Sequence, residues 1–247
     1  MSKDGMLVVE NVTKRFGGLR ALSKVNMEVR RGEILGLIGP NGSGKTTLFN
    51  VIMGFYHPEE GRILLQGEDI TDLKPHQIAR RGVGRTFQIV RPFGDMTVLD
   101  NILVSGLFSA HRGGERRKIE DRCHEILKIT NLTERMNDPA DELSIAEKRR
   151  LEIARALALD PQLLLLDETM AGLTHAEVDQ ALRMISGIRK EFGLTMIVVE
   201  HVMRAIMSIS ERIVVLSEGR KIAEGTPKEV SENEQVLTAY LGRRRAS

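Results

Sequence analysis

Two patterns of apolar residues alternate along the chain and predict a set of strands and helices. Short runs rich in apolar residues are typical of strands, whereas apolar residues three and four positions apart are typical of helices. The first pattern predicts strands at 6–9, 25–29, 33–38, 62–65, 163–166, 195–199 and 213–216. The second pattern predicts helices at about 45–53, 97–107 and 175–191, and a further helix that begins at Val202.

Strands that alternate with helices predict an α/β fold with a mostly parallel sheet. The composition changes between 111 and 122, where charged residues dominate and Gly113-Gly114 indicates a break between two helices. We therefore predict a helical insertion at about 95–155. Because we find neither an internal repeat nor an interdomain linker, we expect residues 1–247 to form one domain that contains this insertion.

Composition narrows the function classes. The 247 residues carry 36 Lys and Arg against 34 Asp and Glu, and this net charge of +2 lacks the bias of a dedicated nucleic-acid binder. The apolar runs are far shorter than the roughly 18 residues of a membrane span, and residues 1–5 are too polar for a signal peptide. We therefore expect a cytoplasmic protein. The single cysteine, Cys123, has apolar neighbours at helical spacing, which favours packing in a core over a reactive thiol.

The strongest chemical signal is a glycine-rich loop between a predicted strand and a predicted helix. Its sequence, Gly39-Pro40-Asn41-Gly42-Ser43-Gly44-Lys45-Thr46, fits the phosphate-binding pattern G-x-x-x-x-G-K-[ST]. Glycines allow successive backbone N–H groups to converge on phosphate oxygens. We expect Lys45 to reach the β and γ phosphates and the Thr46 hydroxyl to coordinate Mg²⁺. The loop predicts a site for Mg²⁺ and ATP.

Two carboxylates, Asp167 and Glu168, follow the apolar run 163–166. Parallel α/β sheets bind their ligands at the carboxyl ends of the strands. Asp167 is expected to organise the Mg²⁺ shell and Glu168 to polarise an attacking water as general base. Taken alone, the pair is equally compatible with an ordinary helix N-terminus, and the phosphate loop in the same chain favours the catalytic interpretation.

Two further polar side chains are candidates for sensing the γ phosphate. His201 follows the predicted strand 195–199, so it is expected at the same sheet edge as Glu168. Gln88 ends a predicted short strand just before the helical insertion. Each is weak evidence alone, and both gain weight from the phosphate loop.

With these motifs, the chain resembles the ATP-binding subunits of ATP-binding cassette (ABC) transporters over nearly its whole length. The phosphate loop, Gln88, the helical insertion, the signature region, the Asp167-Glu168 pair and His201 occur in that family's order. More closely it resembles the branched-chain amino acid importer ATPases, through the following segments: 16–22, 85–88, 91–93, 96–98, 150–157, 171–173 and 239–242. This resemblance implies a P-loop ATPase core with an antiparallel N-terminal β part and a helical subdomain.

The resemblance also implies roles for individual residues. Phe16 matches the aromatic residue that stacks on adenine, although a place in the core of an edge strand is the alternative. Gln88 would join Thr46 and Asp167 as a metal ligand and act with Glu168 and His201 in catalysis. The implied nucleotide-binding set comprises Phe16, Gly39, Pro40, Asn41, Gly42, Ser43, Gly44, Lys45, Thr46, Thr47 and Ser144.

The implied partners are a second ATPase subunit, identical or similar, two transmembrane permease subunits and, indirectly, an extracytoplasmic binding protein. The chain would lie on the inner face of the cell membrane, bind no nucleic acid, and hydrolyse ATP to power import of an amino acid. A soluble cassette ATPase that acts in nucleic-acid repair or translation is the alternative. A small-molecule phosphotransferase is a third possibility, but no acceptor site is evident.

Three positions depart from the family pattern. The signature Leu-Ser-Gly-Gly-Gln is replaced by Leu143-Ser144-Ile145-Ala146-Glu147, in which both glycines are lost. Ser144 and Glu147 also form an S-x-x-E capping box, so Ser144 has two compatible roles, as a helix cap and as a phosphate contact. Thr169 stands where the family usually has proline, and Thr174 where many members have Asp or Asn.

Overall fold

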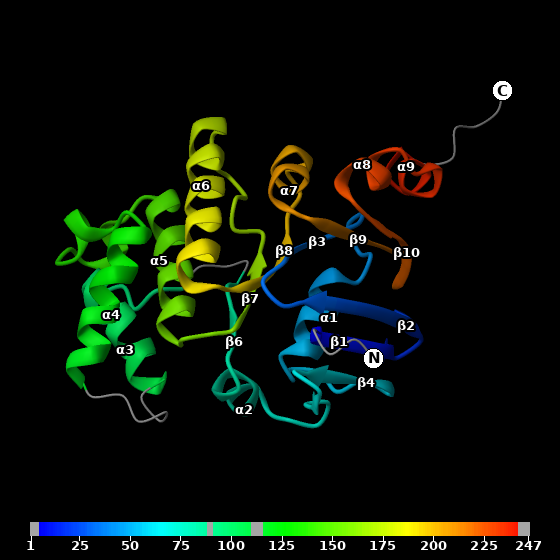
Figure 1. The fold of residues 1–247 in the computed structure, drawn as a ribbon, viewed down its shortest axis with the longest axis horizontal. Helices are drawn as coiled ribbons and strands as arrows, with labels where there is room; N and C mark the ends of the chain where they lie inside the picture. The colour runs from blue at the N-terminus through cyan, green and yellow to red at the C-terminus, as the bar shows by residue number, and fades with distance from the viewer. Residues whose placement is uncertain (1–4, 88–90, 110–115, 242–247) are drawn as a thin grey trace. The chain divides into compact units, whose positions relative to one another are not determined.

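The structure is a computed structural model that describes residues 5–87, 91–109 and 116–241. It divides into two compact units, which we describe separately (Figure 1). The first unit contains residues 1–78 and 195–247, and the second contains residues 79–194. The predicted break at Gly113-Gly114 lies outside the described residues.

The first unit contains four strands of a mainly parallel sheet, in the order β10-β9-β3-β8. β3 (Ile34–Ile38) pairs in parallel with both β8 (Thr195–Val199) and β9 (Arg212–Ser217), and β10 (Arg220–Gly225) pairs antiparallel with β9. The central strands β3 and β8 are buried at every position, as parallel strands covered on both faces require. The helices of this unit are α1 (Lys45–Ile52), α2 (Pro75–Arg80, which crosses the unit boundary), α7 (Met203–Ile209), α8 (Pro227–Ser231) and α9 (Glu234–Leu241).

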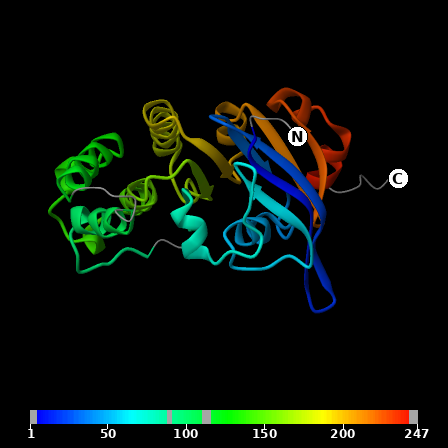
Figure 2. The ribbon, with the colours of Figure 1, turned by 60° about the horizontal axis from the view of Figure 1, so that its bottom comes forward.

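A second, antiparallel sheet belongs to the same unit and has the order β2-β1-β4-β5. Its strands are β1 (Gly5–Phe16), β2 (Leu19–Arg30), β4 (Glu60–Leu65) and β5 (Glu68–Asp69). β1 and β2 form a long hairpin, drawn in blue in Figure 2, that turns at Gly17-Gly18. Both strands are longer than predicted because antiparallel strands with one solvated face accept polar residues that apolar runs do not reveal.

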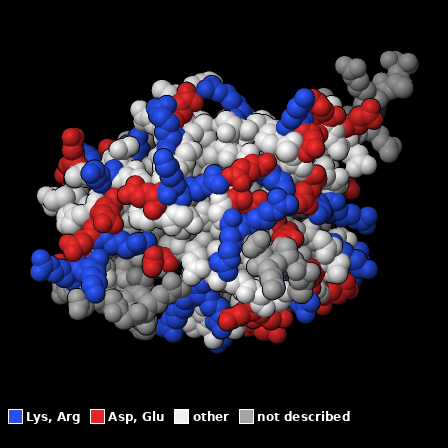
Figure 3. All heavy atoms as spheres, in the orientation of Figure 1, with Lys and Arg blue, Asp and Glu red and all other residues white. Residues whose placement is uncertain are grey.

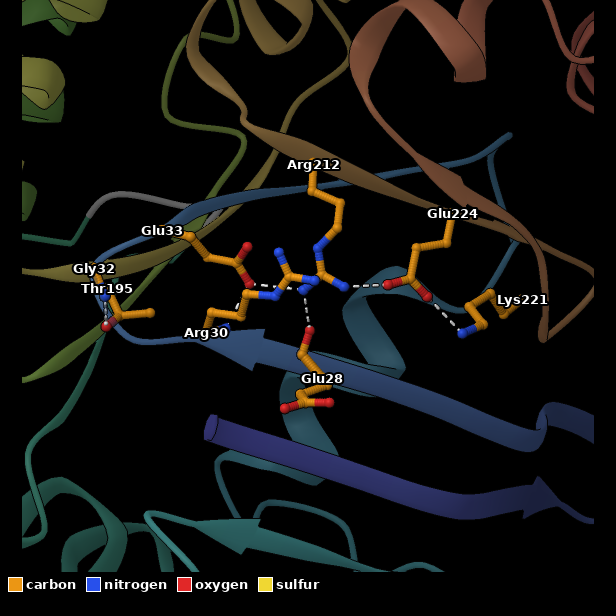
Figure 4. Close-up of polar contacts among 8 residues, drawn as sticks. All are labelled: Glu28, Arg30, Gly32, Glu33, Thr195, Arg212, Lys221 and Glu224. Carbon is orange, nitrogen blue, oxygen red and sulfur yellow. Dashed lines mark hydrogen bonds and ion pairs between the residues drawn. The ribbon is translucent and has the colours of Figure 1, made fainter. Parts of the chain in front are cut away.

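Arg212 connects strands of the two sheets through a polar cluster (Figure 4). Its Nη2 donates to Glu33 Oε1 at 2.8 Å and to the Glu28 carbonyl at 2.5 Å, and its Nη1 pairs with Glu224. Burial works to lower the pKa of Arg212, but the hydrogen bond with Glu33 and the surrounding carboxylates raise it overall. The half-buried guanidinium is therefore charged and compensated, and it joins β2, β9 and β10.

The second unit combines two parallel strands with a group of helices. β6 (Val83–Arg85) pairs in parallel with β7 (Leu163–Asp167). The helices are α3 (Val98–Ser109), α4 (Arg116–Ile129), α5 (Ile145–Ala158) and α6 (His175–Phe192), with short 3₁₀ turns at Thr133–Arg135 and Ala140–Glu142. α3, α4 and α5 lie side by side, drawn in green in Figure 1. β6 ends at Arg85, three residues before the predicted end at Gln88, which lies outside the described residues.

Charge and hydropathy agree with the sequence analysis. On the face shown in Figure 3, positive and negative side chains are interspersed and form no broad field of one sign. Within the described part of the chain, no helix is long and apolar enough to cross a membrane. Cys123 is 1% exposed on α4, and burial raises the pKa of its thiol to about 11, which confirms the predicted packing role.

Candidate functional site

The loop from Gly39 to Gly44 joins β3 to α1, as the sequence predicts. Two of its glycines are required by space as well as by backbone angle. A Cβ at Gly39 would lie 2.1 Å from the Leu216 carbonyl oxygen, and one at Gly44, where φ is 105°, would lie 2.7 Å from the Ala21 carbonyl oxygen. The loop is thus enclosed by β2 and β9. The N-cap of α1 is Gly44, so no side chain caps the first N–H groups of this helix.

The side chains of the loop divide into buried and exposed ones. Lys45 is 5% exposed, and its Nζ donates to the carbonyls of Gly39 at 2.8 Å and Pro40 at 3.1 Å. This places the ammonium group within the curve of the loop. Thr46 is exposed, whereas Ser43 is buried, with its hydroxyl close to Gly39. Ser43 therefore packs within the loop, while Thr46 is accessible to solvent.

Phe16 lies at the end of β1 and is 42% exposed, so it does not belong to the core. Its ring meets Tyr56 edge to face, with the ring centroids 5.1 Å apart, and Lys14 Nζ lies 5.5 Å from its centroid. The 42% exposure leaves part of the ring accessible for contact with a further planar group.

The pairing of β3 with β8 places His201 relative to the phosphate loop. Leu37 on β3 is opposite Val199 on β8 in a parallel ladder, so both strands end at the same sheet edge. Gly39 follows one strand there, and His201 follows the other and is exposed. The structure therefore brings His201 to the edge that carries the phosphate loop.

Tyr240 is a neighbour of the phosphate loop. In the sequence it is recognisable only as part of the family segment 239–242. It lies on α9, and burial raises the pKa of its hydroxyl, while the Gly39 backbone N–H acts in the opposite direction. The sequence distance between 39 and 240 hides this contact, and no local pattern could have revealed it.

In the second unit, Asp167 is the last residue of β7 and is 1% exposed. Arg85 Nη2 donates to Asp167 Oδ2 at 2.8 Å, and the backbone N–H of Asp167 donates to Thr86 Oγ1 at 3.0 Å. Both members of the ion pair are buried, so removing either would leave an unpaired charge. Arg85 is the partner that sequence reasoning missed.

Glu168 follows Asp167 with φ at 51°, in the left-handed region. Six other described non-glycine residues have φ between 49° and 54°, so this angle alone does not mark a functional residue. Glu168 is half-buried at the end of β7. Asp167 is thus buried and ion-paired while Glu168 is partly exposed, which fits separate roles for the two.

The altered signature begins α5 with a complete capping box. Ser144 is the N-cap, its Oγ accepts from the Glu147 N–H at 3.3 Å, and its own N–H donates to Glu147 Oε2 at 2.8 Å. The hydrogen bonds from Ser144 lower the pKa of Glu147, and Arg135 Nε lies 3.6 Å from its Oε1. The capping role of Ser144 is confirmed, and the phosphate role stays a prediction. Ser144 and Ile145 are both exposed.

Thr174, the third departure from the family pattern, has a local explanation. It is the N-cap of α6 and forms a capping box with Glu177. Thr, Asp and Asn are all good N-caps, so the substitution preserves the start of the helix. Thr169 is 3% exposed, and nothing in the structure explains its presence in place of proline.

Comparison with known proteins identifies the class. The family model described as "ABC transporter" matches residues 22–171, which is more than half of the chain. A solved ATP-binding cassette of an ABC transporter, MJ1267 in its ADP conformation, superposes with a TM-score of 0.87 at 30% identity, covering 96% of this chain and 99% of that one. The chain belongs to the ABC transporter family and is an ATP-binding ATPase subunit.

The type within this class follows from closer relatives. The family model described as "Branched-chain amino acid ATP-binding cassette transporter" matches residues 220–246. The high-affinity branched-chain amino acid transport ATP-binding proteins BraF of Pseudomonas aeruginosa and LivG of Escherichia coli are 44% and 42% identical, each over 96% of this chain and 98% of its own length. The chain is of the branched-chain amino acid transport type. None of these comparisons supports the alternative in nucleic-acid repair or translation.

Proposed function

We propose that the chain hydrolyses ATP with Mg²⁺ to power the uptake of branched-chain amino acids. The observation that carries the ATPase chemistry is the position of Glu168, half-buried at the end of β7 directly after the buried Asp167. In this proposal Glu168 is the general base that takes a proton from the attacking water. His201 and Gln88 contact the γ phosphate, and Gln88 lies outside the described residues.

The nucleotide is held by backbone and side-chain groups of the first unit. The Phe16 ring stacks on adenine, the loop N–H groups bind the phosphates, and Lys45 neutralises their charge. The Lys45 ammonium has three N–H donors, of which two bind the Gly39 and Pro40 carbonyls, so a donor remains that can bind a phosphate oxygen. The full set is the one expected from the sequence: Phe16, Gly39 to Thr47, and Ser144 in the signature region.

The donor chemistry of the chain fits Mg²⁺. This ion prefers hard oxygen ligands and is usually held by one or two protein oxygens together with substrate phosphates. The exposed Thr46 hydroxyl, the Asp167 carboxylate and the Gln88 amide oxygen are donors of this kind. When bound, the ion would neutralise charge on the β and γ phosphates.

The proposed partners are a second ATPase subunit and two permease subunits. A solved relative, described as a dimeric structure of the bacterial ABC transporter cassette MJ0796, superposes with a TM-score of 0.81 at 28% identity, covering 90% of this chain and 99% of that one. In a head-to-tail pair, Ser144 would complete the partner's site and the partner's serine would complete this one. The extracytoplasmic binding protein would act through the permeases.

The permease contact is expected at Gln88, which lies outside the described residues, and at the segment 89–96 that follows it. Residues 89 and 90 lie outside the described residues, and Phe93 within the segment is 46% exposed. A cysteine at Phe93 should cross-link to the permeases in the assembled transporter, and intact assembly without any cross-link would contradict this placement.

The decisive experiment replaces the proposed base. In vesicles that contain the assembled transporter, Glu168→Gln should bind ATP normally but lower ATP turnover and leucine uptake by about 100-fold or more, because Gln keeps the shape and loses the base. Glu142→Gln, which changes an exposed carboxylate of the same unit, is the control and should remain active. Normal turnover in Glu168→Gln would refute the assignment, and ATP hydrolysis without leucine uptake in the unmodified transporter would refute the substrate class.

A further inference from the structure

A basic groove, which we call the cationic groove, lies between β2 and β10 in the first unit. It has a volume of about 490 Å³ and is lined by Arg20, Ser23, Lys24, Asn26, Arg220 and Lys221. Four of these six residues are cations, and none of the six is acidic, aromatic or apolar. None belongs to the phosphate loop or to the set implied for nucleotide binding, so the cationic groove is a separate feature of this unit.

Three of the four cations have no compensating carboxylate. Within the described part of the chain, Arg20, Lys24 and Arg220 form no ion pair, and Arg20 Nη1 donates to the Ser23 hydroxyl at 3.4 Å. Lys221 is the exception, because its Nζ pairs with Glu224 at 2.6 Å. Like charges on one surface repel one another, and a surface that serves only solubility intersperses charges of both signs. Unpaired cations gathered in one groove therefore indicate an anionic ligand.

The two walls of the cationic groove are fixed to each other. The Ser23 N–H donates to the Gly219 carbonyl at 2.8 Å, which joins β2 to the turn before β10. Farther along the same strands, Arg212 binds the Glu28 carbonyl of β2 and pairs with Glu224 of β10 (Figure 4). Because these contacts order the walls in the free protein, a ligand that binds between them does not have to order them.

The lining defines the chemistry of the ligand. Guanidinium groups bind phosphate oxygens through paired N–H donors, and four cations require a ligand with several negative charges. The described lining has no aromatic ring on which a base could stack, and no apolar side chain that would hold an acyl chain. We propose that the cationic groove binds a small soluble anion with two or more phosphate groups. This site goes beyond the proposed function, which uses none of its residues.

Binding of inorganic tripolyphosphate to the full chain tests the proposal. The chain is first saturated with ADP, which fills the phosphate loop, and Mg²⁺ is omitted because it would bind the probe. Isothermal titration calorimetry should show one tripolyphosphate bound per chain, with the ADP retained. In the double variant Arg20→Ala with Arg220→Ala, the affinity should fall at least about tenfold, because two charge-assisted hydrogen-bonding groups are lost.

The matched control is Arg30→Ala with Lys228→Ala, which removes two cations from exposed positions of the same unit outside the cationic groove. The control should keep the tripolyphosphate affinity within about twofold of the unmodified protein, because distant exposed charges contribute little. Absence of binding to the unmodified chain, release of ADP in proportion to the bound probe, or equal losses in the two double variants would each overturn the inference. Binding to phosphatidylglycerol vesicles without binding of tripolyphosphate, lost only in the groove variant, would also overturn it and assign the groove to a lipid headgroup.

Discussion

Phe16 lies at the end of β1 and outside the core, which suits its proposed role of stacking on adenine. Its exposed ring contacts Tyr56 at the edge and Lys14 through a cation–π contact. Because Phe16 is 42% exposed and lies outside the core, contact with an adenine would displace no core side chain. The sequence alone left a core position open for this residue, since a single aromatic at a strand end has no periodic context.

We expect Phe16→Ala to weaken ATP binding by about 5- to 150-fold, because stacking of a base on an aromatic ring contributes roughly 1–3 kcal/mol. Phe16→Tyr retains the ring and is the matched variant, with affinity close to the unmodified protein. The measurement is equilibrium binding of ATP, with circular dichroism to confirm folding. Unchanged affinity in a folded Phe16→Ala would remove the ring from the nucleotide site.

Cys123 gives a second test at the scale of one residue. Burial raises its pKa from 9.0 to about 11, so at pH 8 the folded protein holds a neutral thiol. Alkylation with iodoacetamide should therefore be slow in the native state and become fast on unfolding in urea. Below pH 9 the thiol is neutral in both the folded and the unfolded state, so it does not change the stability. As the pH rises towards 11, the unfolded state loses the proton before the folded state does, so the folded state becomes less stable. Rapid alkylation of the native protein would contradict this burial.

At the scale of elements, three helices begin with the same device. Ser144 with Glu147, Thr174 with Glu177 and Thr226 with Glu229 form capping boxes at the starts of α5, α6 and α8. The box at α5 was predictable because its pattern is local. By contrast, β10 and α9 were missed, since β10 is a mostly polar edge strand and α9 is short. The local sequence pattern thus predicts the start of a capped helix better than it predicts an edge strand.

The capping box of α5 can be separated from the proposed phosphate role of Ser144. Ser144→Ala and Thr226→Ala should each cost about 1 kcal/mol of stability, or about 2–4 °C in the melting temperature of a chain of this size. Only Ser144→Ala should also lower ATP turnover in the assembled transporter, because Thr226 caps a helix outside the signature. Equal turnover in the two variants would leave Ser144 as a cap alone.

The pH dependence of this cap has a defined sign. The hydrogen bonds from Ser144 lower the pKa of Glu147 from 4.5, so its contribution is fully present above that pH and is lost as the pH falls through the lowered value. The stability difference between the unmodified protein and Glu147→Gln, measured by urea unfolding, should be constant near neutral pH and shrink below pH 4.5. A difference that persists unchanged in acid would show that the charge of Glu147 contributes nothing.

At the scale of the whole molecule, the order of the motifs was predictable and the supporting contacts were not. The phosphate loop, the acidic pair and His201 each follow a strand that the apolar pattern reveals. Arg85 beside Asp167, Glu152 beside Phe87 and Tyr240 beside Gly39 come from distant parts of the sequence. Such partners depend on tertiary packing, which hydrophobic periodicity does not encode.

The altered signature leads to a prediction about the assembled transporter. In the proposed head-to-tail pair, the loop from Leu143 to Glu147 would complete the partner's ATP site, whereas Lys45, Glu168 and His201 would serve this chain's own site. The capping box and Arg135 engage the Glu147 carboxylate within its own unit, which limits its repulsion of a partner's phosphates. The side chains of Ile145, 67% exposed, and Ala146 nevertheless stand where glycines would allow closer approach of backbone N–H groups.

With a second ATPase subunit that retains both signature glycines, the two ATP sites should therefore be unequal. This chain's own site is completed by the intact partner loop and should turn over normally, while the partner's site, completed by Ile145 and Ala146, should be slow. Glu168→Gln should then cost most of the ATPase activity, and the same substitution of the partner's catalytic glutamate much less. The matched restoration, Ile145→Gly with Ala146→Gly, should narrow that gap. Equal losses from the two single glutamate variants would refute the asymmetry.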